Sequence, residues 1–398
     1  MNHHYQFKCF LSRIFFLLLF SNCTSNSIEN RCNSDHELIK PKIIKEIKID
    51  VEGKQYSHKF SQTAYFDNTD WYFGLDYSRN CIDIISLTHQ KFHESLCFIN
   101  DGSEGSIDVT DFYFHNRDSI ILLSNFGKIQ IINFDGDLTD EYDLNSEKVD
   151  KWVEDELLAG IESGPPRIHY DELSKNLYIP SYAPVYNTDS HYLSSPTLVS
   201  YNLKKREYEE IGSLIPEDIK GKKVSPIIDS HEYNIVKIEP SGNILISYMA
   251  SSFFSFGKLG APDSLKLFCR TSKFLENNII DFTGDINDIN HQRNYQIQAG
   301  RYDKSIYLPE LNRFIVSVRH NQQLKDLNGN LNNPFNTDFS ILILNENFKA
   351  LKEFKVPKEK YNFNKVYSHS EGVLIMKENP NDENNEEDLL EFSVFAID

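Results

Sequence analysis

The chain has 398 residues, a formal net charge of -18 at pH 7, and 28 Phe and 21 Tyr against 3 Met. Nucleic acid needs a basic surface opposite its phosphates, so this charge excludes nucleic acid as a partner. Aromatic side chains suit the pleated, half-buried surface of a β-sheet, so the composition predicts an all-β fold.

The first residues predict an export signal rather than a part of the fold. Lys8 and Arg13 precede the short apolar run 14–20, and Cys23 follows that run. The run is shorter than the roughly 20 apolar residues that span a bilayer. We therefore expect residues 1–22 to be a signal peptide and Cys23 to carry the lipid of a bacterial lipoprotein. Cleavage without lipidation and an uncleaved anchor are the alternatives.

The expected location is the bacterial cell envelope. The residues after Cys23 are polar, so we expect 23–41 to be a tether and 42–398 to be a single folded domain. Thr24 lacks the acid that often signals retention at the inner membrane, which favours an outer-membrane lipoprotein facing the periplasm or the exterior. The lipid would be the only attachment to a membrane.

Two cysteines are placed for a cross-strand bridge. Cys81 and Cys97 are equally distant from His89, the midpoint of a candidate hairpin, so they would lie opposite each other. Because an exported protein meets an oxidising compartment, we expect a disulfide between them. Two buried thiols that merely pack are the alternative.

Groups of four short strands, separated by turns, recur along the chain. The clearest unit has expected strands at 111–114, 119–124, 129–134 and 139–144. Four strands at a time are typical of a propeller blade. Further units are expected at 63–99, 167–214, 235–274 and 305–356, followed by a unit of only three strands at 365–396.

A lone N-terminal strand would complete the last unit. Residues 42–50 have a strand pattern and no nearby partner, and closing a ring removes unpaired sheet edges. We therefore predict a six-bladed β-propeller closed by an N-terminal strand that joins the C-terminal blade. Helical spacing over 148–161 predicts one helix between the second and third blades.

One stretch resembles the signature region of a known family. Residues 104–120 (EGSIDVTDFYFHNRDSI) are similar to a bacterial lipoprotein family catalogued as domain of unknown function 4221, and His115-Asn116 is their most specific part. The resemblance covers the chain from about residue 42 onward. It implies a lipoprotein signal and a propeller-like body, and it implies no activity.

Three long connections predict where a partner binds. The turn between second and third strands is short in the first two units, but long at 182–196, 250–263 and 319–338. Equivalent turns project from one face of a propeller, and long loops are often functional. Their aromatic and basic side chains would recognise a protein, peptide or glycan in the envelope, or would fold inward as small cores over the blades. The candidate binding residues are Tyr182, Tyr186, His191, Tyr192, Phe253, Phe254, Phe256, Arg319, His320 and Phe335.

The sequence lacks the common motifs of enzymes. His-Glu-x-x-His, Gly-x-Ser-x-Gly, a phosphate-binding Gly-rich loop and Cys-x-x-Cys do not occur. We therefore expect a non-enzymatic binding or scaffold protein with no catalytic residue, metal or cofactor. The alternative is a metal-dependent hydrolase or lyase with a site on the axis of the ring, for which Asp111, His169 and His369 are candidates. A purely structural envelope component is a third possibility.

Overall fold

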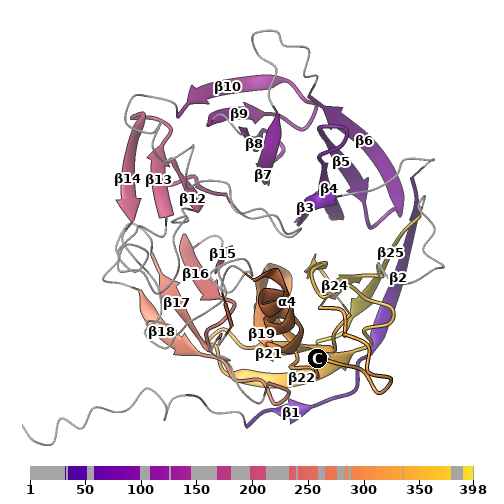
Figure 1. Ribbon diagram of the computed structural model, residues 1–398. Coiled ribbons are helices and arrows are strands. Elements are labelled where there is room, and N and C mark those ends of the chain that lie inside the picture. The colour runs from indigo at the N-terminus through magenta and orange to yellow at the C-terminus, as the bar shows by residue number, and fades with distance from the viewer. Residues whose placement is uncertain are drawn as a thin grey trace, which may run out of the picture.

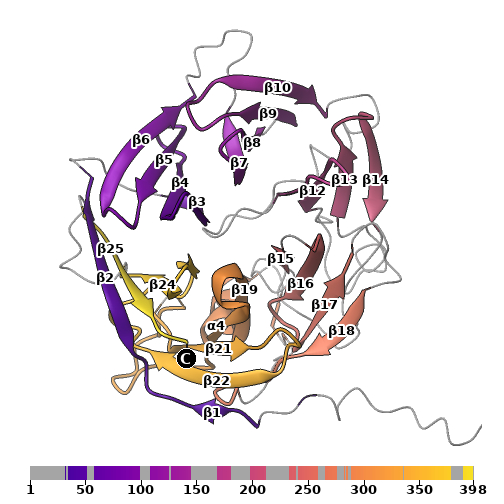
Figure 2. The ribbon, with the colours of Figure 1, turned by 180° about the vertical axis from the view of Figure 1, so that it is seen from behind.

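Six small β-sheets stand side by side around a common axis, as Figure 1 and the reverse view in Figure 2 show. The prediction of an all-β, six-bladed propeller is therefore confirmed. The computed structural model describes residues 32, 35–51, 58–98, 108–124, 127–144, 168–180, 198–211, 233–238, 241–258, 265–275, 282, 284–285, 288–334, 336–377 and 389–397.

In each of the first three blades, the strands are in chain order from the axis to the outside of the ring. Blade one contains β3 (His58–Phe66), β4 (Thr69–Asp76), β5 (Cys81–Ser86) and β6 (Lys91–Cys97). Blade two contains β7 (Val109–Asn116), β8 (Ser119–Ser124), β9 (Lys128–Ile132) and β10 (Leu138–Asp143). Blade three contains β11 (His169–Asp171), β12 (Asn176–Pro180), β13 (Leu198–Asn202) and β14 (Glu207–Ile211).

The remaining blades repeat this arrangement. Blade four contains β15 (Tyr233–Ile238), β16 (Asn243–Tyr248), β17 (Phe253–Gly257) and β18 (Lys266–Cys269). Blade five contains β19 (Arg301–Leu308), β20 (Arg313–Arg319), β21 (Phe339–Leu344) and β22 (Ala350–Val356). Blade six contains β23 (Val366–His369), β24 (Gly372–Met376), β25 (Leu389–Phe395) and, on the outside, β2 (Ile43–Asp50).

The N-terminal strand closes the ring as predicted. β2 pairs antiparallel with β25, and Ile47 lies opposite Phe392. Figure 1 shows β2 in indigo against the yellow end of the chain. The two ends of the domain are thereby joined in one sheet.

Blade four differs from the prediction. Its third strand is β17, which lies inside the segment 250–263 that we expected to be a long loop. A tight turn joins β16 to β17, because the amide of Ser251 bonds the carbonyl of Tyr248 and the hydroxyl of Ser251 accepts from the amide of Phe253. The long insertion predicted in this position does not exist.

The core is divided among the junctions between blades. Six hydrophobic clusters each join two neighbouring blades, including the clusters around Phe112 (blades one and two), Phe254 (blades four and five) and Phe392 (blades six and one). Middle strands are buried on both faces, so Phe339–Leu344 is buried at every residue. Because the apolar side chains pack at the junctions between blades, other residues line the axis of the ring.

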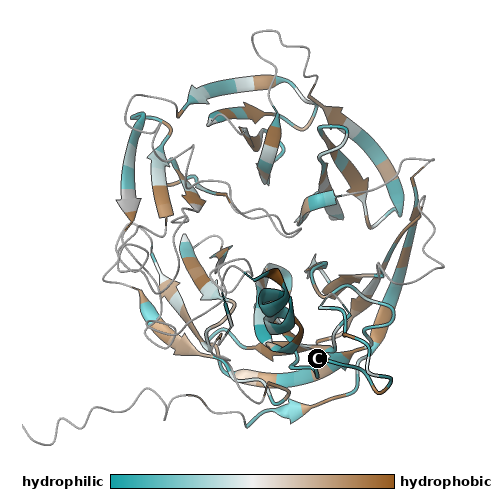
Figure 3. Cartoon of the chain, in the orientation of Figure 1, coloured by the Kyte–Doolittle hydropathy of each residue, from teal (hydrophilic) through white to brown (hydrophobic). Residues whose placement is uncertain are grey.

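One helix of the described residues overlaps the opening of the ring when the molecule is viewed along its axis (Figures 1 and 2). α4 (Ile289–Gln298) begins at Asp288, whose side chain accepts a hydrogen bond from the amide of Asn290. It is largely hydrophilic, as Figure 3 shows, and Tyr295 packs into the cluster between blades three and four. The helix predicted at 148–161 lies outside the described residues. No helix in the described ranges is long and apolar enough to cross a membrane.

Two disulfides occur among the described cysteines. Cys81 and Cys97 are joined across β5 and β6, the pair that the sequence singles out. The second disulfide, Cys32–Cys269, was not predicted and joins the N-terminal segment to blade four.

Part of the predicted tether is attached to the ring. Short strand β1 (Glu37–Leu38) pairs in parallel with β22, and the imidazole of His36 lies 2.9 Å from the carboxylate of the buried Glu353. The last residues of the tether expected at 23–41 are therefore part of the folded ring.

Candidate functional site: the central cavity

A cavity of about 610 Å³ lies on the axis of the ring. All six innermost strands contribute to its wall, so every blade takes part. This volume is in the range of about 300–1,000 Å³ that is common for small-molecule sites. Polar side chains in the wall include Gln62, Thr63, His115, His169, Lys237 and His369.

The mouth of the cavity is formed by the turns between first and second strands. Asp67, Arg117 and Glu310 come from three of these turns, line the cavity and are exposed. The deeper wall includes Ser61 and Ser305, which are buried. Since successive strands are antiparallel, the connections between second and third strands, where we predicted the recognition loops, lie on the opposite face of the ring.

Polar side chains link each inner strand to the next around the axis. The amide of Gln62 bonds both the main-chain N–H and the carbonyl of Phe114, at 2.9 Å each, and so joins blades one and two. The other five junctions have bonds of the same kind, from a side chain of one blade to the main chain of its neighbour: Asp111 with Ile168, Lys237 with Tyr170, Asn234 with Ser305, Lys304 with Asn364, and Lys365 with His58. These bonds hold the ring open around the cavity.

His169 is the most unusual group in the wall. It is 8% exposed, and neither ring nitrogen has a hydrogen-bond partner in the protein. Burial, and to a smaller extent the charge of Lys237, lower the pKa of His169 from 6.5 to about 3. At neutral pH it is an uncharged ring that offers one donor and one acceptor. Both nitrogens are enclosed by protein atoms, so the ring lowers the stability of the wall by about 1–3 kcal/mol.

His369 lies in blade six. This blade is opposite blade three, which contains His169. Its Nδ1 accepts the amide N–H of Glu371 at 3.1 Å, so the neutral ring has its proton on Nε2. That Nε2 is buried without a hydrogen bond, and its nearest acid oxygen is Oδ2 of Asp70 at 3.5 Å. Burial lowers the pKa of His369, and the charge of Asp70 opposes the shift only in part.

Several charged groups of the wall have protein partners. Arg117 pairs with Asp67 at 3.1 Å, and the Lys237 ammonium donates to the Tyr170 carbonyl at 2.9 Å. The carboxylate of Asp70 accepts from the amide and hydroxyl of Ser370. The wall also contains the acidic residues Asp118 and Glu310, so it presents both charged and neutral polar groups.

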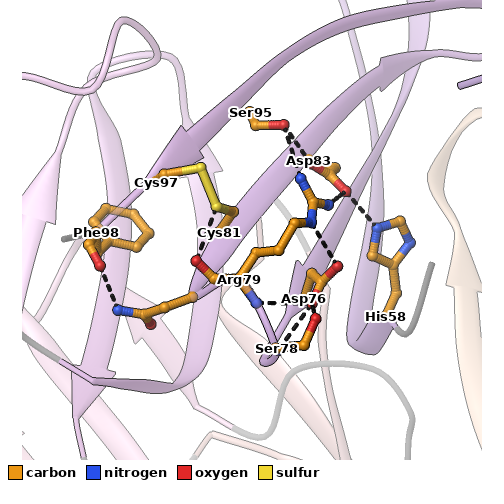
Figure 4. Close-up of a disulfide and its surroundings, with 10 residues drawn as sticks. His58, Asp76, Ser78, Arg79, Cys81, Asp83, Ser95, Cys97 and Phe98 are labelled. Atoms are coloured by element: carbon orange, nitrogen blue, oxygen red, sulfur yellow. Dashed lines mark hydrogen bonds and ion pairs between the residues drawn. A yellow bond between two sulfur atoms is a disulfide. The ribbon is translucent and has the colours of Figure 1, made fainter. Parts of the chain in front are cut away.

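Blade one supports the cavity wall through a buried polar network (Figure 4). Ser61 accepts from the Tyr72 hydroxyl, which also contacts Nδ1 of His58. Figure 4 shows the other end of the network, where Nε2 of His58 lies 2.9 Å from Asp83. Burial alone would raise the pKa of Asp83, but its hydrogen bond and charge interaction with His58, its hydrogen bond with Ser95 and the charge of Arg79 hold this pKa below its usual value. The network fixes β3 to the middle of the blade.

The five predicted recognition residues that the structure describes do not form a common exposed surface. Phe254 is fully buried and packs against Phe348, because β17 is a strand of the core. Arg319 and His320 are 2% and 6% exposed, and the Arg319 guanidinium lies over the ring of Phe363. For these three side chains the inward-folding alternative holds, and the listing of them as exposed binding residues is wrong, because they pack at the junctions between blades.

The remaining candidates divide into two groups. Phe253 and Phe256 are half-buried in β17 and so belong to blade four rather than to a loop. Five candidates lie outside the described residues: Tyr182, Tyr186, His191, Tyr192 and Phe335.

The candidates for an axial metal site are only partly brought together. His169 and His369 both line the cavity, but the Asp111 carboxylate accepts the amides of Phe112 and Ile168. In the described part of the chain, no three His, Cys, Asp or Glu side chains form a group that could hold a metal ion.

Sequence reasoning did not single out the cavity as the site. Gln62, Thr63 and Lys237 lie in ordinary strand patterns, so each alone is inconspicuous. The available signal was their shared position, since each lies in the first strand of its repeat.

Comparison with known proteins gives the family. A family model described as Domain of unknown function (DUF4221) matches residues 44–355, which is most of the chain. The chain belongs to this family. The resemblance of residues 104–120 is thereby confirmed. No curated protein matches the chain significantly.

Two solved structures resemble this chain. One is a member of the DUF4221 family from Bacteroides vulgatus ATCC 8482, with a TM-score of 0.70 and 13% identity over 89% of this chain and 97% of that chain. The other is a protein of Bacteroides fragilis NCTC 9343 that is regarded as exported, with a TM-score of 0.57 and 11% identity over 91% and 98% of the two chains. At these identities the likeness shows the propeller fold alone.

Proposed function

We propose that this DUF4221 protein is an envelope-anchored, non-enzymatic binding protein that takes a small polar ligand into its central cavity. The observation that carries the proposal is the cavity of about 610 Å³ on the axis, whose wall contains polar side chains such as Gln62, Thr63 and His115. The open mouth and the contribution of every blade support the same conclusion. The predicted recognition face is replaced by the opposite face.

A cavity-filling substitution tests this proposal. Ile306 lies half-buried in the cavity wall, so Ile306→Trp would occupy the space a ligand needs. Ile44→Trp is the matched control, because Ile44 is 43% exposed on the outermost strand of blade six. The purified protein is exposed to a mixed set of sugars, sugar acids, amino acids, dipeptides and nucleosides, and binding is measured by ligand-observed NMR.

The expected result is binding that Ile306→Trp abolishes and Ile44→Trp preserves. Binding that survives Ile306→Trp at full strength would place the site elsewhere and refute the proposal. A wild-type protein that binds no molecule of the set would also count against it.

The proposed location is the cell envelope, with a lipid on Cys23. The basic and apolar N-terminus, the two disulfides and the structural neighbour from Bacteroides fragilis that is regarded as exported support export. Mass spectrometry of the protein from bacterial membranes should find a diacylated or triacylated Cys23 at the new N-terminus, and Cys23→Ala should release the protein from the membrane. An unmodified Cys23 in a membrane-bound protein would exclude this anchor.

A further inference from the structure

We propose that the outer rim of blades four and five contacts the anionic headgroups of the membrane that holds the lipid on Cys23. This inference rests on the proposed envelope anchor. It adds a second, electrostatic contact to the lipid, which is the only attachment predicted from the sequence. The ring would then stand on this rim, with its axis along the membrane surface and the mouth of the cavity opening to the side.

The N-terminal segment is fastened to this rim at three places. Cys32 forms its disulfide with Cys269, at the end of β18, and β1 pairs with β22. Between these two points, the buried imidazole of His36 lies 2.9 Å from Glu353, and the Lys273 ammonium donates to the carbonyl of His36. Figure 1 shows β1 outside β22, on the outermost edge of the ring. The chain therefore reaches the folded domain at the rim of blades four and five.

The distance from the proposed lipid to this rim is short. Cys32 follows Cys23 by nine residues, and a chain of that length spans at most about 30 Å when it is fully extended. The disulfide with Cys269 fixes Cys32 on blade four. The rim of blades four and five is therefore the part of the ring that the anchor would hold nearest to the membrane.

Lysines are concentrated on the same rim. Segments 265–275 and 349–360, which contain β18 and β22, have seven lysines that are exposed or half-buried, and their only acid that is not buried is Glu359. In a chain with a net charge of -18, this is a local reversal of sign. The seven are Lys266, Lys273, Lys349, Lys352, Lys355, Lys358 and Lys360.

These lysines extend from one face of the ring to the other. Lys349 follows the turn that joins β21 to β22, which lies on the same face as the cavity mouth because successive strands are antiparallel. Lys355 lies near the other end of β22, and Lys360 lies beyond that end. A basic patch on one face alone would turn that face toward an anionic surface. Lysines along the whole rim favour a contact from the side.

The outer strand on the opposite side of the ring is acidic. Blade two is opposite blade five, and residues 133–144, which include β10, contain five exposed acids and no Lys or Arg. Figure 1 shows β10 and β22 on opposite sides of the ring. An anionic surface attracts the rim of blade five and repels that of blade two, so the charges and the anchor favour the same orientation. The five acids are Asp135, Asp137, Asp140, Glu141 and Asp143.

Several rim lysines are available to lipid headgroups. None of the ion pairs in the described part of the chain involves Lys266, Lys349 or Lys355, although the Lys355 ammonium lies over the Phe274 ring at 4.7 Å. Each lysine that lies close to an anionic bilayer strengthens the attraction about fivefold. Contact by several lysines is therefore enough to select one orientation of a protein that the lipid already holds.

Labelling of lysines on the anchored protein tests this orientation. Lipidated protein is inserted into vesicles of phosphatidylethanolamine with phosphatidylglycerol, which are anionic, or into vesicles of phosphatidylcholine alone. A membrane-impermeant, amine-reactive reagent is added, and mass spectrometry measures the rate of reaction at each lysine. The reference lysines are Lys91 and Lys128, which belong to blades one and two across the ring.

We expect Lys266, Lys349 and Lys355 to react at least threefold more slowly on the anionic vesicles than on the neutral ones. The rates at Lys91 and Lys128 should differ less than twofold between the two kinds of vesicle. High salt should remove the protection of the rim, because it screens the charges.

Two variants with the same change of net charge separate the rim from a general effect of charge. Lys266→Glu/Lys349→Glu should abolish the protection of Lys355 on anionic vesicles, whereas Lys91→Glu/Lys128→Glu should preserve it. If a glutamate variant fails to fold, the corresponding glutamine variants, which only remove the charges, should show the same difference between the two pairs.

Each other outcome is decisive. Rim lysines that react equally on both kinds of vesicle, or protection of Lys91 and Lys128 instead, would overturn the orientation. Protection that persists on neutral vesicles or in high salt would overturn the electrostatic contact. A Cys23 without lipid would refute the proposed anchor, and its mass separates that failure from a lipidated protein whose rim stays reactive, which would overturn this inference alone.

Discussion

His169 and His320 are buried rings whose charged forms the folded protein disfavours. Burial lowers their pKa values from 6.5 to about 3 and about 4. In the unfolded chain these rings bind protons below pH 6.5, while the folded protein resists protonation. Their contribution to stability is therefore complete above pH 6.5 and is lost as the pH falls toward the folded pKa values.

This difference predicts a steep acid dependence of stability. At pH 5 each such histidine lowers the free energy of unfolding by up to about 2 kcal/mol relative to pH 7. His169→Phe should reduce the slope of stability against pH between 6.5 and 4.5, and His93→Phe should leave it unchanged. Urea unfolding at several pH values measures the slope, and an unaltered slope in His169→Phe would show that the ring titrates normally.

Gly74 makes room for the buried His58–Asp83 pair. A Cβ at this position would stand 2.4 Å from the His58 ring, which lies over β4 to reach Asp83 in β5. We predict that Gly74→Ala lowers the free energy of unfolding by about 2–4 kcal/mol, because it displaces one partner of a buried ionic contact.

A double-mutant cycle separates this cause from a general effect of alanine. In a His58→Ala background the ring is absent, so the additional cost of Gly74→Ala should fall below about 1 kcal/mol. Chemical denaturation of the four variants gives the coupling energy. Strictly additive costs would mean that the glycine is needed for another reason.

At the scale of single elements, β2 shows which contacts close the ring. Ile47 is fully buried in the cluster between blades six and one, whereas Ile44 in the same strand is 43% exposed. We predict that Ile47→Ala costs about 2–4 kcal/mol of unfolding free energy and Ile44→Ala less than about 0.5 kcal/mol. If both substitutions lower the free energy of unfolding equally in a denaturation experiment, the buried side of β2 does not hold the ring closed.

Elements with a strong local pattern could be predicted, and those without one could not. The strands of blade two and the closing strand 42–50 follow from apolar runs and turns, and the Cys81–Cys97 pairing follows from hairpin symmetry. The serines and glycines around β17 favour a loop at this place in the sequence, although the segment forms a strand. α4 has no apolar stripe, since its buried residues are Gln292, Tyr295 and Ile297, and so periodicity gave no signal for it.

At the scale of the molecule, the ring itself creates the candidate site. Six apolar clusters hold neighbouring blades together, and six polar links surround the axis, so a cavity remains where the innermost strands face one another. The sequence identifies the blades but not which end of the axis is open. That depends on how side chains such as Arg319 fold into the blade junctions, which no local pattern encodes.

The central claim is that ligand enters the axis through the face formed by turns such as those at Asp67 and Glu310. A crystal structure of the protein saturated with the tightest-binding probe tests it directly. The account predicts ligand density inside the cavity, in contact with the innermost strands. Density on the opposite face, beside the connection 320–338, with an empty cavity would contradict it.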